Sequence, residues 1–141
     1  MTDYTLHCFA QSGHAYKAAL MLNLCGLEWQ PRFVDYFNGE TRTPDYRRLN
    51  EMGEVPVLIA GDEKFSQSGV ILQYLTDQTG QFGPQNDAER YEILRWLLFD
   101  NHKLSSPIGT WRYLLTFAKT GETGGLGIVS QALPRALRDR G

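Results

Sequence analysis

Two kinds of hydrophobic pattern alternate along the first half of the chain. Short runs of β-forming residues are separated by longer segments that are rich in Ala, Leu and Met or that carry apolar residues at helical spacing. The pattern predicts four strands (residues 4–9, 30–36, 55–59 and 64–66) and three helices (residues 15–24, 44–50 and 69–78). Helices between the first three strands permit right-handed crossovers, and Gly61-Asp62 predicts a hairpin that adds the fourth strand antiparallel. We therefore expect an α/β fold, in which a mixed four-stranded sheet carries helices on both faces.

The second half of the chain has helical patterning only. Gly and Pro residues predict a linker over residues 80–86, with one domain over 1–79 and a partial, all-helical domain over 87–141. The helical part is expected to contain a helix capped by Asp87 and running to about Phe99, a continuation beyond a kink near Pro107, a glycine-rich loop over 120–127 and a final helix over 129–138.

Composition excludes several classes of protein. A chain of 141 residues with 42% hydrophobic residues buries a core without disulfides or metals, and we expect no metal site. Its 14 basic and 16 acidic side chains argue against a nucleic-acid binder. The sequence has no apolar run of about 18 residues, as a membrane span needs, and the first residues lack the pattern of a signal peptide. Cys8 and Cys25 form neither a disulfide framework nor a zinc motif, so we expect a cytoplasmic protein.

Two segments and their spacing carry a family resemblance. They are Glu54-Val55-Pro56-Val57-Leu58 and Gln67-Ser68-Gly69-Val70-Ile71-Leu72-Gln73-Tyr74-Leu75, and a strand-to-helix turn at Ser12 lies upstream. This arrangement resembles the cytosolic glutathione S-transferase superfamily over residues 4–78, and more loosely to about residue 117. The resemblance implies a thioredoxin-like N-terminal domain, a helical C-terminal domain and a cis peptide bond before Pro56.

The second segment suggests a binding site for an anion. Ser68 at a helix start either caps its own helix or, with the helix dipole, holds a negatively charged group. The resemblance implies that it holds the γ-glutamyl carboxylate of glutathione. Gln67 stands where the family often has a Glu that pairs with the ligand's ammonium, and it keeps an acceptor oxygen without the charge. The backbone of Val55, beside Pro56, is implied to pair antiparallel with the cysteinyl unit.

Ser12 is the candidate catalytic residue. By itself a serine at this place is an ordinary helix cap. The resemblance implies that its hydroxyl stabilises the thiolate of bound glutathione and so lowers the pKa of that thiol. Cys8 stands where other classes of the family carry a catalytic tyrosine, and we expect a small buried residue there. His14 has no acidic neighbour in sequence to complete a hydrolase triad with Ser12.

Two further positions match the pocket for the glycyl carboxylate. Arg42 is suited to bind that group through two hydrogen bonds. Glu54 departs from the family pattern of Lys or Gln, and its charge would repel the ligand unless the side chain points away. Aromatic residues between 87 and 117 either form a helix-bundle core or line an apolar pocket for the second substrate.

The resemblance implies an enzyme with glutathione as co-substrate, and the composition leads us to expect no nucleic-acid or membrane partner. The bound thiol would attack a small electrophile, in a detoxifying reaction, and the protein would be a homodimer. One alternative is glutathione-dependent reduction of a disulfide or peroxide at the same site. Another is a non-catalytic binding module, which Glu54, Gln67 and the short helical part favour. A short helical part would also leave apolar surface exposed on its first helices.

Overall fold

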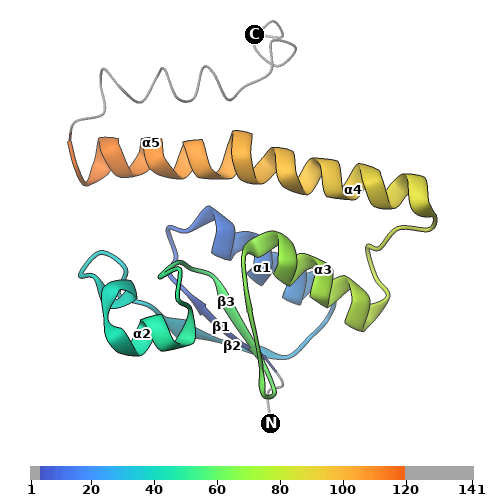
Figure 1. The fold of residues 1–141 in the computed structure, drawn as a ribbon, viewed down its shortest axis with the longest axis horizontal. Coiled ribbons are helices and arrows are strands. Elements are labelled where there is room, and N and C mark those ends of the chain that lie inside the picture. The colour runs from blue at the N-terminus through green and yellow to red at the C-terminus, as the bar shows by residue number, and fades with distance from the viewer. Residues whose placement is uncertain (1–3, 120–141) are drawn as a thin grey trace, which may run out of the picture. The chain divides into compact units, whose positions relative to one another are not determined.

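The computed structural model describes residues 4–119, and the chain divides into two compact units, Met1–Gly83 and Pro84–Gly141 (Figure 1). The first unit contains β1 (Tyr4–Cys8), α1 (Gly13–Leu24), β2 (Trp29–Phe33), η1 (Glu40–Arg42), α2 (Pro44–Leu49), β3 (Val57–Ala60), β4 (Glu63–Ser66) and α3 (Ser68–Thr79). Every strand and helix predicted for this unit is confirmed, with small shifts at the ends. The short 3₁₀ helix η1 lies between the predicted second strand and second helix, where the pattern predicts no element.

The sheet has the strand order β2-β1-β3-β4. β1 pairs parallel with β2, and β3 pairs antiparallel with both β1 and β4. β2 is shorter than predicted because the chain turns after Val34, whose N–H donates to the carbonyl of Cys8 and whose carbonyl accepts from Tyr36. The predicted mixed, thioredoxin-like sheet with helices on both faces is confirmed.

The main core lies between the sheet and the pair of helices α1 and α3. Leu6 of β1 faces Leu58 of β3 in the register of the sheet, and both are fully buried. Their partners come from both helices, and the cluster is Leu6, Ala18, Met21, Leu22, Cys25, Leu58, Ile71 and Leu75. Because neighbouring strand residues face opposite ways, Val57 points to the other face of the sheet, where Figure 1 shows α2. This packing fixes the N-termini of α1 and α3 relative to each other.

Helix starts follow the sequence signals in part. Ser12 and Thr43 cap α1 and α2 with their side chains, and Pro44 stands in the first turn of α2. The prediction that Ser68 caps α3 is wrong, because Gln67 takes the cap position and Ser68 is the first helical residue.

The second unit is described as far as residue 119. It contains α4 (Asp87–Phe99), η2 (Asp100–Ser105), which is a π-helical segment, and α5 (Ser106–Thr116). Asn86, and not the predicted Asp87, caps α4, because its side-chain oxygen accepts from the N–H of Glu89.

The kink predicted near Pro107 stays a prediction. A π-helical segment lies immediately upstream of this proline, which stands in the first turn of α5. The predicted loop at 120–127 and helix at 129–138 lie outside the described residues. No helix within residues 4–119 combines the length and the apolar character needed to cross a bilayer.

Candidate functional site

The N-terminus of α1 is built around Ser12. Its backbone N–H donates to the carbonyl of Phe9, which closes the turn that follows β1. Its hydroxyl oxygen accepts from the N–H of Ala15 at 3.1 Å. The cap bond uses a lone pair of the hydroxyl and leaves its proton to be donated elsewhere. Ser12 is thus a structural cap whose hydroxyl still has a donor function to offer.

The N-terminus of α3 meets that of α1 through two side chains. Ser68 exposes only 2% of its surface, and its Oγ lies 3.2 Å from Nδ1 of His14. The two residues are 54 positions apart in sequence. Sequence reasoning set His14 aside because it tested only a hydrolase triad. The signal that could have found it is a lone imidazole in the first turn of an Ala-rich helix, two residues after the Ser12 cap.

Gln67 and Glu54 form a second polar contact beside Ser68. Gln67 has a positive φ of 68°, a conformation that non-glycine residues rarely adopt, and this turns the chain into α3. Its Nε2 donates to Oε2 of Glu54 at 2.8 Å. The side-chain nitrogen of Gln67 makes this bond, so the side-chain oxygen of the same amide can still accept a hydrogen bond. The carboxylate of Glu54 therefore lies next to Gln67 rather than pointing away from it.

The segment before β3 is held by buried side chains of α2 and its cap. The hydroxyl of Tyr46 and the amide nitrogen of Asn50 donate to the backbone carbonyl of Glu54, at 3.0 and 2.9 Å. Both of these side chains are buried, and burial raises the pKa of Tyr46 to about 12. The peptide bond between Val55 and Pro56 is cis, and the paired residues of β3 begin only at Val57. The backbone of Val55 thus precedes the sheet ladder and lies outside it.

Arg42 does not join this cluster. It is the last residue of η1 and its side chain is exposed. Within residues 4–119, no described contact links it to Ser12, Ser68 or Gln67.

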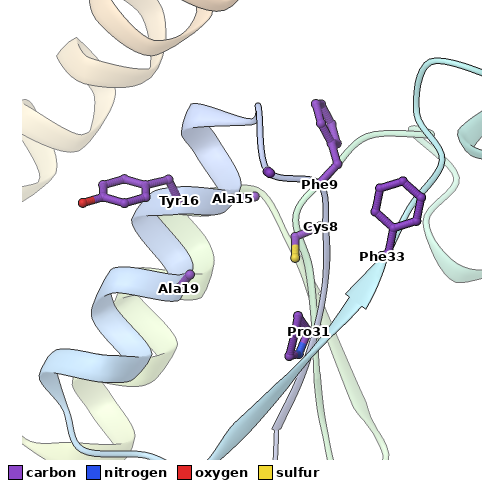
Figure 2. Close-up of a pocket in the computed structure, with 8 residues that line it drawn as sticks. Cys8, Phe9, Ala15, Tyr16, Ala19, Pro31 and Phe33 are labelled. Carbon is purple, nitrogen blue, oxygen red and sulfur yellow. The ribbon is translucent and has the colours of Figure 1, made fainter.

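An apolar cavity of about 340 Å³ opens beside the first turn of α1. Figure 2 shows Tyr16 and Ala19 of α1 on one side of it, with Phe9 and Phe33 on the other. The full lining is Cys8, Phe9, Ala10, Ala15, Tyr16, Ala19, Pro31 and Phe33. Ala15 also donates its N–H to Ser12, so the cavity and the cap of α1 share a residue.

Cys8 is half-buried in this lining rather than fully enclosed, and burial raises the pKa of its thiol. That direction is the opposite of what a reactive thiolate needs. Cys25 is buried. Within residues 4–119, no three His, Cys, Asp or Glu side chains gather where they could hold a metal ion.

Comparisons with known proteins point to one family. Residues 11–78 match the family model described as the glutathione S-transferase N-terminal domain. Glutathione S-transferase 1 of Dianthus caryophyllus is 38% identical over 73 residues, which are 52% of this chain and 33% of the relative. A zeta-class glutathione S-transferase of Euphorbia esula is 33% identical over 73 residues, covering 52% and 32%. The chain therefore spans about a third of the length of these relatives.

Solved structures match over more of the chain. A possible glutathione S-transferase of Rhodopseudomonas palustris is 32% identical with a TM-score of 0.81, covering 92% of this chain and 67% of that one. A glutathione transferase of Burkholderia graminis, solved with two glutathione molecules bound per subunit, is 26% identical with a TM-score of 0.80, covering 99% and 62%. Together with the sheet order and the paired helix starts, these matches show that the chain belongs to the cytosolic glutathione S-transferase superfamily.

Proposed function

We propose that this chain binds glutathione at the meeting point of α1, α3 and the segment before β3, and that it activates the glutathione thiol for attack on a small electrophile. The observation that carries the proposal is the contact between His14 and Ser68, which joins two helix N-termini beside Ser12. Helix N-termini favour negative charge, and two of them here serve two anionic groups of one substrate, the γ-glutamyl carboxylate and the cysteinyl thiolate.

Recognition would use the α3 side of the site. The hydroxyl of Ser68 and the first N–H groups of α3 receive the γ-glutamyl carboxylate. The ammonium beside that carboxylate donates to the amide oxygen of Gln67 and lies near the carboxylate of Glu54, which accepts from Gln67 at 2.8 Å. Glu54 thereby supplies the negative charge that Gln67 lacks, and attraction to the ammonium replaces the repulsion expected from sequence. The backbone of Val55, outside the ladder, pairs with the cysteinyl unit.

Arg42 is exposed and does not contact the cluster, and its guanidinium suits the glycyl carboxylate. We assign it the outer end of the site on charge alone.

Activation would use the α1 side. Ser12 accepts from Ala15 and has its hydroxyl proton to donate to the thiolate sulfur. That hydrogen bond and the N-terminus of α1 both favour the charged form of the thiol, so its pKa falls. The thiol proton goes to solvent, the thiolate forms a carbon–sulfur bond to the electrophile, and the displaced group leaves with its electron pair. The apolar cavity beside Ser12 suits an electrophile with an apolar body.

The setting that we propose is a cytoplasmic homodimer with a detoxifying role. Exposed aromatic side chains of the first unit support an association surface, because Tyr36 is 38% exposed and Phe37 is 39% exposed. A non-catalytic glutathione-binding module is the second candidate, since no residue of α4, η2 or α5 is buried and the second unit contributes no core of its own within the described residues.

Calorimetry with glutathione tests binding, and the ultraviolet absorbance of the bound thiolate tests activation. Ser12→Gly keeps the helix start at a cost of a few tenths of a kcal/mol but removes the hydroxyl. We expect it to raise the pH at which the bound thiol ionises by about one unit, while Ser12→Thr, which keeps a hydroxyl, changes it little. A wild-type chain that does not bind glutathione would contradict the proposal. Binding with an unchanged thiol pKa in Ser12→Gly would favour the non-catalytic module.

A further inference from the structure

The contact between His14 and Ser68 has a direction, and that direction matters for an anionic ligand. A serine hydroxyl has one proton to donate and lone pairs that accept, and a neutral imidazole nitrogen either donates or accepts. The two atoms, Nδ1 and Oγ, lie 3.2 Å apart, so one of the two residues donates to the other. The geometry allows both directions.

A carboxylate removes this ambiguity. An ionised carboxylate only accepts hydrogen bonds. To bind the carboxylate, the hydroxyl of Ser68 must therefore donate its single proton to the ligand. The oxygen of Ser68 must then accept from His14, which requires a proton on Nδ1. In the opposite arrangement, Ser68 donates to a bare Nδ1 and has no proton for the ligand.

Burial makes the choice consequential. Ser68 is 2% exposed, so bulk water has little access to reorient its hydroxyl. The imidazole comes from a different helix, two residues after the Ser12 cap. The partner on α1 therefore has a direct influence on where the proton of Ser68 points.

We propose that His14 is a positioning residue for ligand binding: it donates Nδ1–H to Ser68 and thereby directs the hydroxyl proton of Ser68 toward the α-carboxylate of a γ-glutamyl ligand. This inference rests on the proposed function, because it needs a carboxylate at the N-terminus of α3. A histidine that merely tied α1 to α3 would be indifferent to the direction of the hydrogen bond.

The direct test is nitrogen-15 NMR of the imidazole rings of the wild-type chain saturated with glutathione. The sequence has three histidines, so assignment through a His14→Asn sample is straightforward. We expect a protonated Nδ1 on His14 in the complex. A bare Nδ1 with the proton on Nε2 would overturn the inference. The protonation state is read on the wild-type chain, and the His14→Asn sample serves only to assign the signals.

Variants give an independent test by calorimetry. Losing a hydrogen bond to a charged group weakens binding by about tenfold, which we expect for Ser68→Ala. We expect His14→Ala to weaken it by about fivefold and His14→Asn, whose amide also donates, to stay within about twofold of wild type. In a Ser68→Ala background, His14→Ala should have no further effect. Gln78→Ala, on an exposed position of α3, is the matched control.

The ligand itself supplies the last control. For 4-aminobutanoyl-cysteinyl-glycine, which is glutathione without the α-carboxylate of the γ-glutamyl residue, Ser68→Ala and His14→Ala should both bind like wild type. Two outcomes would overturn the inference, because each would mean that His14 only holds α1 against α3. One is an equal loss of affinity for both ligands, and the other is binding by His14→Asn that is as weak as binding by His14→Ala. Absence of glutathione binding by the wild-type chain would instead contradict the proposed function.

Discussion

The two units of the chain are stabilised in different ways. The first has a closed core, in which twelve hydrophobic residues between Leu6 and Leu75 are buried. In the second unit, no residue of α4, η2 or α5 is buried. In these three elements and the residue that follows them, the exposed large hydrophobic residues are Tyr91, Leu94, Trp96, Leu98, Ile108, Tyr113, Leu115 and Phe117.

Local interactions take the place of a core in α4. Asn86 caps the helix, and the pairs Asp87–Arg90 and Glu92–Arg95 lie one turn apart along it. Ion pairs on such an exposed helix contribute little and the cap about 1 kcal/mol, whereas burial of one large apolar side chain contributes about 1.5–3 kcal/mol. The buried core that stabilises the chain and the residues of the proposed site therefore lie in the same unit.

The largest expected effect comes from a matched pair of leucines. Leu75 of α3 is fully buried and Leu98 of α4 is 63% exposed. We expect Leu75→Ala to lower the free energy of unfolding by about 2–5 kcal/mol, because it leaves a cavity, and Leu98→Ala to change it by less than about 0.5 kcal/mol. Denaturant unfolding followed by circular dichroism measures both. A similar loss in the free energy of unfolding for the two variants would contradict this difference between the units.

The next effect is a pH dependence that belongs to the first unit. Burial, and to a smaller degree Glu40 and Cys8, raises the pKa of Tyr46 to about 12. A phenol whose pKa is higher in the folded chain stabilises the fold fully below about pH 10, and that contribution is lost as the pH rises toward 12. We expect a loss of up to about 2 kcal/mol across this window.

Two Tyr→Phe variants isolate the contribution of this side chain. Tyr46→Phe should flatten the alkaline decline of the free energy of unfolding. Tyr91→Phe, at a position of α4 that is 66% exposed, should leave the slope as in wild type. Equal slopes in all three proteins would show that Tyr46 is not the group responsible.

The smallest expected effect tests whether Glu54 belongs to the binding site. Since Glu54 is proposed to attract the ligand's ammonium, Glu54→Gln should weaken glutathione binding about three- to tenfold, measured by calorimetry. Leu98→Ala should bind like wild type. Tighter binding by Glu54→Gln would mean that the carboxylate repels the ligand, as the sequence alone suggests.

Much of the fold was predictable because its signals are local. Strand and helix positions follow from hydrophobic spacing, and the caps at Ser12 and Thr43 act within three residues of themselves. The same cap preferences gave a wrong cap residue for α3 and for α4. The predicted caps, Ser68 and Asp87, each lie one residue after the observed cap. At Gln67 the positive φ turns the chain into α3 one residue before the serine that looked like the cap.

Local sequence patterns predict the order of the elements, the mixed sheet and the residue types available for a site. Packing between elements selects which of these residues meet: His14 with Ser68 across 54 positions, and Gln67 with Glu54 across 13. The reason is that helical and strand periodicities act over a few residues, whereas contacts between side chains of different elements depend on how helices pack on the sheet. A core built from Leu6, Leu58 and Leu75 sets that packing, and it places a histidine of one helix against the serine that begins another.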